Sequence, residues 1–213
     1  MRLPVWGLGR RAPPDSPHAT PGDHARAALG ALDDLAENGP VAVVAHSAGG
    51  LVATELSALA PERIGAVLGL SAVFPEDGQS STSCLPAPQR WVLPVVMRLA
   101  GTRPPEAAVR RHLAAGADEA AVQRLLADLT PESRAYHRTP VRGRVRAERR
   151  GYVFSDDDSE LPAVLQQRSA ARLQPAVTEH LPGGHLPMLL HPERLQQLIT
   201  RFVQRRASGS RHD

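Results

Sequence analysis

The feature that most constrains this chain is residues 41–50, where a short apolar run ends in a serine and a helical pattern begins at once. Val41 to Ala45 is continuous and rich in valine, as in a buried parallel strand. Residues 49–60 predict a helix that ends before Pro61. A serine between a strand and a helix stands on a sharp, strained turn whose neighbours must be small. Positions 45 and 49 hold Ala and Gly, so the pattern Ala-x-Ser-x-Gly around Ser47 predicts a nucleophile elbow.

Such a turn predicts where the Ser47 hydroxyl and the Ala48 N–H lie. It places the Ser47 hydroxyl above the carboxyl ends of the strands, where open α/β sheets bind ligands. It also places the backbone N–H of Ala48 at the start of a helix, where it can stabilise an oxyanion. The alternative is an ordinary strand, turn and helix with a chance serine. The buried strand before Ser47 and the helix after it favour the elbow.

A serine hydroxyl is a weak nucleophile at neutral pH and needs a base that is itself oriented by an acid. In sheets with this elbow, the acid and then the histidine follow the serine along the chain. Residues 156–158 are three aspartates that follow a strand pattern, and His185 lies in a glycine-rich loop before the last helix. The residues therefore predict Ser47 as the nucleophile, His185 as the base and an acid after that strand.

Each of these partners also has a purely structural interpretation. Three consecutive aspartates usually form a solvated turn, and they lack the spacing and the later Glu of an EF-hand calcium loop. A single histidine such as His185 is more often a surface or capping residue. Of the other histidines, His46 lies beside the elbow and His191 precedes the last helix, and neither is as well placed to act as a base.

The remaining patterns predict one α/β domain over residues 1–213. Apolar runs typical of buried strands at residues 66–72, 151–155 and 176–181 alternate with helical patterns. This alternation favours a mostly parallel sheet with helices on both faces. Residues 75–140 interrupt it, and we expect them to form a helical cap, or lid, over one end of the sheet. The other predicted segments are helices at residues 23–37 and 192–205, an extended proline-rich loop at residues 10–22, and cap helices within residues 91–130 that break at Pro94, Gly101, Pro104-Pro105 and Gly116.

Charge and cysteine content exclude several other classes of function. Arginine supplies all the positive charge of a chain with a formal net charge of +3. The densest basic run, residues 142–150, has no aromatic residue for base stacking, so we interpret it as a solvated linker and expect no nucleic-acid partner. The single cysteine, Cys84, cannot build a thiolate metal cluster, and we expect neither a metal nor another cofactor. No segment predicts a signal peptide or a membrane span, so we expect a soluble, cytoplasmic protein.

Three segments carry a resemblance to a known family. They are residues 45–50 (Ala-His-Ser-Ala-Gly-Gly), residues 152–162 (Tyr-Val-Phe-Ser-Asp-Asp-Asp-Ser-Glu-Leu-Pro) and residues 183–195 (Gly-Gly-His-Leu-Pro-Met-Leu-Leu-His-Pro-Glu-Arg-Leu). They resemble the plant methylesterase and hydroxynitrile lyase branch of the α/β-hydrolases and its bacterial esterase relatives. The resemblance runs from Leu3 to Val203, and residues 3–13 are similar to the loop after the family's fourth strand. It implies the α/β-hydrolase fold, with Asp158 as the acid and His185 as the base.

The chain departs from this family at its beginning. Family members begin with a strand that ends in His-Gly, and the loop after that strand supplies a second oxyanion donor. No such dipeptide occurs near Met1, so the first strands of the fold are expected to be missing. Loss of one oxyanion donor costs about 10²–10³-fold in rate, and the strand before Ser47 would have a bare edge. Either the true start lies further upstream, or this is a truncated member in which residues 2–5 pair with that strand.

The leading expectation is hydrolysis of a small ester. Ser47 attacks the carbonyl, His185 takes and returns the proton, Asp158 orients His185, and the Ala48 N–H holds the oxyanion. The helices within residues 91–129 would roof an apolar pocket. Two alternatives stay open: a truncated, catalytically silent binding protein of the same fold, and a lyase of the hydroxynitrile lyase type, which the resemblance permits but no residue here supports.

Overall fold

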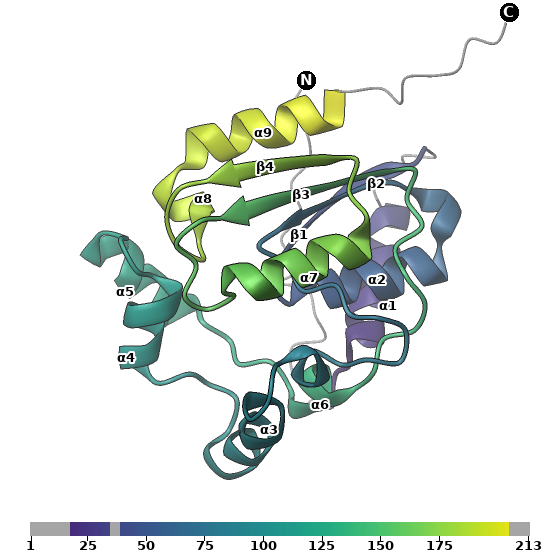
Figure 1. Ribbon diagram of the computed structural model, residues 1–213. Helices are drawn as coiled ribbons and strands as arrows, with labels where there is room; N and C mark the ends of the chain where they lie inside the picture. The colour runs from purple at the N-terminus through teal and green to yellow at the C-terminus, as the bar shows by residue number, and fades with distance from the viewer. Residues whose placement is uncertain (1–17, 35–38, 205–213) are drawn as a thin grey trace, which may run out of the picture.

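Four strands form one parallel sheet in the computed structural model, which describes residues 18–34 and 39–204 (Figure 1). The strand order is β1-β2-β3-β4, so neighbouring strands follow one another along the chain. The elements are α1 (Pro21–Asp34), β1 (Val41–His46), α2 (Gly49–Leu59), η2 (Pro61–Arg63), β2 (Ile64–Leu70), η3 (Thr82–Cys84), α3 (Gln89–Ala100), α4 (Glu106–Ala108), η4 (Val109–Leu113), α5 (Glu119–Asp128), α6 (Arg134–Arg138), β3 (Arg149–Ser155), α7 (Ala163–Leu173), β4 (Val177–Leu181), α8 (Pro187–Leu190) and α9 (Pro192–Gln204).

All three strand pairs are parallel, which confirms the predicted α/β class and parallel sheet. In the register Ala45 lies opposite Gly69, and Tyr152 lies between Gly69 and Thr178. Because the strands are parallel and in register, their carboxyl ends meet at one edge of the sheet. The segments that follow β1, β2, β3 and β4 therefore all begin at that edge, which is where the predicted site residues lie in the sequence.

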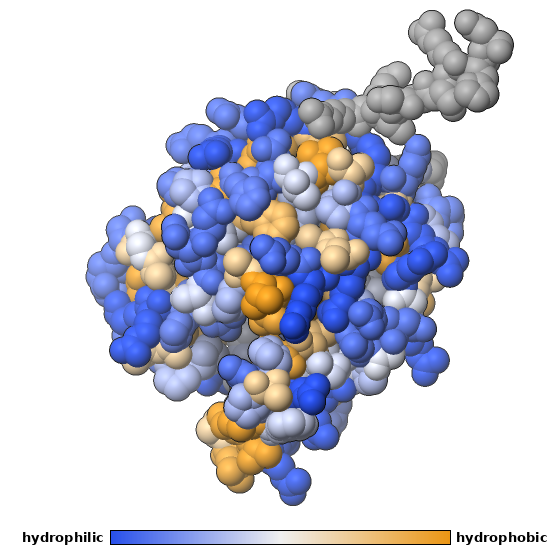
Figure 2. Space-filling model, in the orientation of Figure 1, coloured by the Kyte–Doolittle hydropathy of each residue, from blue (hydrophilic) through white to orange (hydrophobic). Residues whose placement is uncertain are grey.

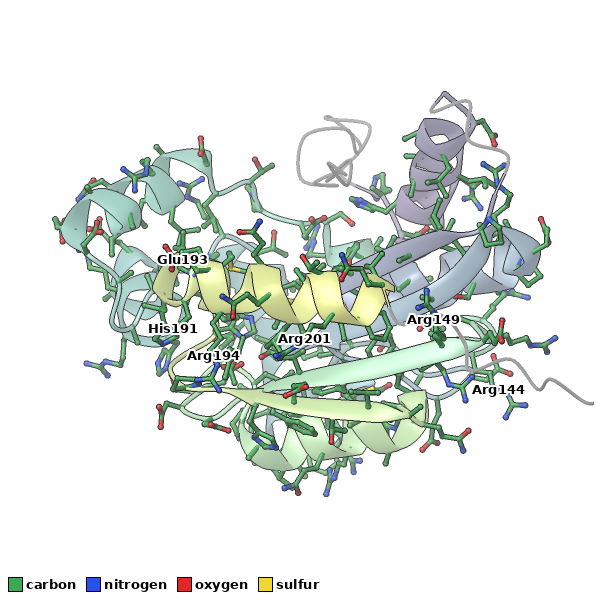
Figure 3. All side chains as sticks on the ribbon, turned by 90° about the horizontal axis from the view of Figure 1, so that it is seen from above. Arg144, Arg149, His191, Glu193, Arg194 and Arg201 are labelled. Atoms are coloured by element: carbon green, nitrogen blue, oxygen red, sulfur yellow. The ribbon has the colours of Figure 1, made fainter. Side chains whose placement is uncertain are left out.

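Helices cover both faces of the sheet, as predicted. α1, α2 and α7 lie on one face, and α9 lies on the other (Figure 1). The apolar side of α9 contributes Leu195, Leu198 and Phe202, which pack with Leu68 and Val153 of the sheet. Seen from above in Figure 3, α9 runs along the sheet with Arg194 near its first turn and Arg149 near its last. Nη1 of Arg149 donates to the carbonyl oxygens of Phe202 and Val203 at 3.2 and 3.3 Å, which satisfies two carbonyls at the helix end.

The prediction that the first strand is buried was wrong on one face. In β1, Ala42 and Val44 are exposed while Ala45 is buried. The exposed pair lies on the α9 side of the sheet, since Ala42 and Val44 pair with Ala66 and Leu68, which pack in the α9 cluster. The structure pairs β1 with β2 on one side only in the described residues, so β1 is an edge strand there. Because β1 lies at the edge of the sheet, α9 does not cover the face that carries Ala42 and Val44.

Several predicted boundaries differ for local reasons. The predicted strand 66–72 is β2, Ile64–Leu70, and it ends earlier because Ser71 has a φ of 41°. The first helix begins at Pro21 because Thr20 and Asp23 exchange hydrogen bonds between side chain and backbone, which caps the helix. The helix α7 was not predicted. The predicted ends of the first and last helices, Glu37 and Arg205, lie outside the described residues, as do residues 2–5 and 3–13.

Residues 75–140 connect β2 to β3 and contain the helices η3, α3, α4, η4, α5 and α6. They lie apart from the sheet, below and to the left in Figure 1. The predicted break at Pro94 was wrong, because α3 continues through this proline and ends at Gly101, whose φ is 83°. No helix of the described residues is long and apolar enough to cross a membrane.

Candidate active site

Ser47 stands on a strained turn between β1 and α2. Its φ is 53°, in the left-handed region that costs a residue with a side chain about 1–2 kcal/mol. Two backbone hydrogen bonds hold this conformation: the Ser47 N–H donates to the carbonyl of Leu70 at 3.3 Å, and its carbonyl accepts from the N–H of Val73 at 2.9 Å. The turn is thus fixed by the segment that leaves β2, and Ser47 itself stays partly exposed at the sheet edge.

The small residue that this turn most needs is Gly50, which the sequence pattern did not single out. A Cβ atom at Gly50 would lie 2.3 Å from the carbonyl oxygen of Val73, which is closer than any real contact. A Cβ at Gly49 would meet nothing within 4 Å. The interpretation that position 49 must be small was therefore wrong. The residue that must be small is Gly50, because α2 packs closely there against the backbone that follows β2.

A continuous chain of hydrogen bonds joins the three predicted residues. Nε2 of His185 lies 2.9 Å from Oγ of Ser47, and Nδ1 of His185 lies 2.7 Å from Oδ2 of Asp158. The side chains of His185 and Asp158 are 2% and 0% exposed, respectively. A carboxylate can only accept, so Nδ1 carries the proton in this arrangement and Nε2 is free to accept from the Ser47 hydroxyl. A hydroxyl next to such a nitrogen can lose its proton to it as the oxygen attacks an electrophile.

The three consecutive aspartates have three different positions. Oδ1 of Asp158 accepts from the N–H groups of Glu160 and Leu161 at 2.9 and 2.8 Å, which leaves Oδ2 directed at His185. Asp156 and Asp157 are exposed. Their N–H groups donate to the carbonyls of Leu181 and Gly183, respectively, and thereby attach the loop after β3 to the loop that carries His185. Only the third aspartate points inward.

Gln166 of α7 holds the loop of Asp158 in place, and sequence reasoning missed it. Its amide nitrogen donates to the carbonyls of Ser155 and Leu161, both at 2.9 Å, and its amide oxygen accepts from the Ser155 N–H at 3.1 Å. This buried side chain therefore fixes both ends of the segment that contains Asp158. The sequence did contain a signal for α7: its buried residues recur at helical spacing, namely Gln166, Ser169, Ala170 and Leu173.

His46 contacts the backbone of His185. Its Nε2 lies 2.8 Å from the carbonyl oxygen of His185, and the two rings lie 4.8 Å apart. Burial, together with the charge of His185, lowers the pKa of His46 to about 4. His46 is therefore neutral at neutral pH and donates its Nε2 proton to that carbonyl. The sequence argument that His46 is badly placed for a base agrees with this position, but it missed the contact with His185.

Ala48 lies between the turn of Ser47 and helix α6. It is the N-cap residue of α2, and in the described part of the chain its N–H has no hydrogen-bond acceptor. Its carbonyl accepts from the Tyr136 hydroxyl of α6 at 2.8 Å. The segment of residues 75–140 also reaches the loop of His185, since a Cβ at Gly184 would lie 3.5 Å from the carbonyl oxygen of Ala115. Residues 114–136 thus flank both the turn of Ser47 and the loop of His185.

Metal chemistry has no support from the side chains that the structure describes. They contain no group of three or more His, Cys, Asp or Glu residues that could hold a metal ion. His180 and Asp156 form an exposed pair at 2.7 Å. A single pair of this kind does not make a metal site. Cys84 is half-buried against Arg172, and burial raises the pKa of its thiol.

Comparison with known proteins places the chain in a family. No curated protein sequence matches it. An extracellular alpha/beta-hydrolase from a Paenibacillus species has a TM-score of 0.76 at 17% identity, covering 90% of this chain and 83% of that one. A methylesterase from Arabidopsis has a TM-score of 0.65 at 18% identity, covering 85% and 77%. A pyrethroid hydrolase from Sphingobium faniae has a TM-score of 0.57 at 21% identity, covering 91% and 82%.

These structures share the fold of this chain. The model of the alpha/beta hydrolase family matches residues 2–198, which is most of the chain. The resemblance that the three sequence segments indicated is thereby confirmed. With its parallel sheet and this match, the chain belongs to the alpha/beta hydrolase family.

Proposed function

We propose that this chain is a serine hydrolase that cleaves small carboxylic esters, with Ser47 as nucleophile, His185 as general base and Asp158 as the acid that orients His185. The observation that carries the proposal is the chain of hydrogen bonds from Oδ2 of Asp158 through His185 to Oγ of Ser47. A nucleophile, a base within hydrogen-bond reach and an acid behind the base are the parts that acyl transfer to a serine needs.

The proposed reaction has two steps. Oγ of Ser47 attacks the ester carbonyl carbon while its proton moves to Nε2 of His185, and the backbone N–H of Ala48 donates to the oxygen that becomes negative. His185 then returns the proton to the departing alcohol oxygen, which leaves an acyl group on Ser47. Water, deprotonated by His185, attacks this acyl group in the second step. The acid product leaves, and the proton returns to Ser47.

Two features support an ester as the substrate. Several similar structures are named as esterases, including polyneuridine aldehyde esterase and the Arabidopsis methylesterase. The cap of residues 75–140 flanks Ser47 and the loop of His185 through Tyr136 and Ala115, which suits a roof over an apolar acyl or alcohol group. We expect short, uncharged esters to be preferred over amides, because an alcohol is the better leaving group.

A fluorophosphonate probe tests the nucleophile directly. We expect covalent labelling of the wild type at Ser47, detected by peptide mass spectrometry, and turnover of p-nitrophenyl acetate and butyrate. Ser47→Ala removes both signals. Ser71→Ala is the matched control, because Ser71 also follows a strand with a positive φ of 41°, but its buried hydroxyl donates to Oγ of Ser155. This variant keeps the label on Ser47.

Two results would contradict the proposal. One is a label that persists in Ser47→Ala, which would assign the reactivity to another residue. The other is an absence of both labelling and turnover in a folded wild type. If nitrophenyl esters then raise the melting temperature without being cleaved, the protein binds such ligands and does not hydrolyse them.

A further inference from the structure

Helix α3 carries an apolar stripe that faces solvent. Five of the nine large apolar side chains that are exposed in the described residues belong to this helix: Trp91, Val92, Val95, Val96 and Leu99, which are 61, 53, 55, 47 and 82% exposed. Their alternating intervals of one and three residues place them on one side of the helix. Met97 is buried on the opposite side. Figure 2 shows this stripe as a hydrophobic cluster at the lower edge of the molecule.

The segment that carries this stripe has charge of one sign. Residues 78–105 contain three arginines and no acidic residue. Arg90 and Arg98 of α3 are exposed, and the guanidinium of Arg90 lies 4.5 Å from the ring centre of Trp91. The helix α6, which contacts α3, adds the exposed Arg134 and Arg138. Within the described part of the chain none of these four arginines has a carboxylate partner, whereas Arg26, Arg63, Arg110 and Arg172 each form an ion pair.

We propose that α3 docks the protein on an anionic lipid surface. A helix with one apolar side, a tryptophan and flanking arginines has the composition of helices that lie in the plane of a bilayer interface. The four aliphatic side chains would enter the acyl boundary, and Trp91 would sit at the level of the headgroups. Arg90 and Arg98 would extend their charges to lipid phosphates while their aliphatic stems stay against the apolar layer.

A second copy of the chain fits this surface less well. A twofold contact through α3 would bring the same unpaired arginines of two molecules together, and like charges across an interface oppose association. An ordinary protein partner would also need hydrogen bonds, which protein interfaces make about once per 100–200 Å². Val92, Val95, Val96 and Leu99 offer none. A fluid, negatively charged lipid surface needs no such complementarity.

Docking through α3 does not depend on the chemistry of Ser47. α3 lies in the cap, on the segment between β2 and the helix α6 that contacts the turn through Tyr136. A lipid surface at α3 would therefore lie beside the proposed site. The two proposals can fail separately, since vesicle binding is measurable in Ser47→Ala.

Co-sedimentation with vesicles tests the docking. We expect the wild type to pellet with vesicles that contain phosphatidylglycerol and to remain in solution with vesicles of phosphatidylcholine alone. The double variant Val95→Glu/Leu99→Glu should lose binding by tenfold or more, because charges enter the stripe. Arg90→Gln and Arg98→Gln should each weaken binding by about fivefold and reduce its salt dependence. Val164→Glu is the matched control, because Val164 is 53% exposed on α7, away from the stripe, and this variant should bind as the wild type does.

Three results would overturn the docking proposal. The first is a wild type that does not pellet with phosphatidylglycerol vesicles. The second is equal binding by the double variant, whose native fold is checked by circular dichroism. The third is a dimer, seen by sedimentation velocity, that Leu99→Glu dissociates, because a second copy would then cover the stripe. Binding is scored by sedimentation and not by esterase activity, because residues 75–140, which include α3, are also proposed to roof the substrate.

Discussion

The two sides of the proposed site are built differently. On the sheet side, Asp158 and His185 are buried, and all their side-chain polar atoms have partners: Asp158 bonds to the N–H groups of its own loop and to His185, and His185 also bonds to Ser47. On the cap side, residues 75–140 reach the turn of Ser47 through the single hydroxyl of Tyr136, and α3 exposes its apolar stripe. The three side chains of the proposed chemistry therefore meet at the sheet edge. We expect residues 75–140 to add contacts without setting this geometry.

The sharpest test of the sheet side exchanges one oxygen of Asp158. In Asp158→Asn the amide nitrogen can donate to Nδ1 of His185. Nδ1 then acts as an acceptor, so the ring proton moves to Nε2. Nε2 can then no longer accept the proton of the Ser47 hydroxyl. We expect kcat for a nitrophenyl ester to fall by about 10⁴-fold, as for the corresponding change in serine proteases. The fold and KM should change little.

Asp157→Asn is the control for this variant. Asp157 is adjacent and exposed, and its Oδ2 accepts only from the N–H of Gly183 at 3.1 Å. We expect its kcat to stay within a few-fold of the wild type. Equal losses in the two variants would mean that the loop as a whole, and not the carboxylate of Asp158, supports activity.

A second test asks how rigidly the turn of Ser47 is held. Gly50→Ala places a Cβ 2.3 Å from the carbonyl oxygen of Val73, so α2 or the segment after β2 must move. We expect the free energy of unfolding, measured in urea, to fall by about 3 kcal/mol, with a large loss of activity. Gly49→Ala meets no atom within 4 Å and should leave stability nearly unchanged. If Gly50→Ala changes neither the free energy of unfolding nor the activity, the turn can adjust to the added Cβ.

The sequence was sufficient for the parts that depend on local pattern and chain order. The valine-rich run, the turn and the order of serine, acid and histidine predicted β1, α2, Ser47 and His185, together with an acid after β3. Local pattern cannot tell which of three consecutive aspartates turns inward, because that depends on backbone bonds from Asp156 and Asp157 to Leu181 and Gly183. The family resemblance supplied Asp158.

Other features depend on contacts between distant segments, which one sequence does not contain. The need for Gly50 follows from its close approach to the backbone of Val73. His46 meets the carbonyl of a residue 139 positions away. The helix α7 was missed because its buried side carries the polar residues Gln166 and Ser169, which weaken the apolar period.

A third test separates positioning from packing at His46. His46→Phe keeps a ring beside His185 but removes the donor to its carbonyl oxygen. We expect kcat to fall about tenfold, which corresponds to one hydrogen bond, with KM nearly unchanged. His46→Gln retains a donor and should recover part of the loss. If both variants lose activity equally, His46 acts by packing alone.

The lowered pKa of His46 also predicts how stability depends on pH. In the folded protein this pKa is about 4, below its ordinary value of 6.5. Between these values the unfolded chain binds more protons than the folded one, so stability falls as the pH decreases from 6.5 toward 4. We expect the melting temperature of His46→Gln to fall less than that of the wild type over this range. If the melting temperatures of the two proteins fall equally between pH 6.5 and pH 4, His46 is not a buried, neutral residue.

The smallest expected effect tests the link between cap and turn. Tyr136 and Tyr152 each donate to a backbone carbonyl at 2.8 Å, Tyr136 across the cap to Ala48 and Tyr152 within the core to Ala72. Each change to Phe should lower the free energy of unfolding by about 1 kcal/mol, because a carbonyl loses its donor. If the cap adds contacts without setting the geometry, Tyr136→Phe changes kcat by no more than a few-fold. A loss comparable to that of Asp158→Asn would show that the cap fixes Ala48 and that the two sides of the site form one unit.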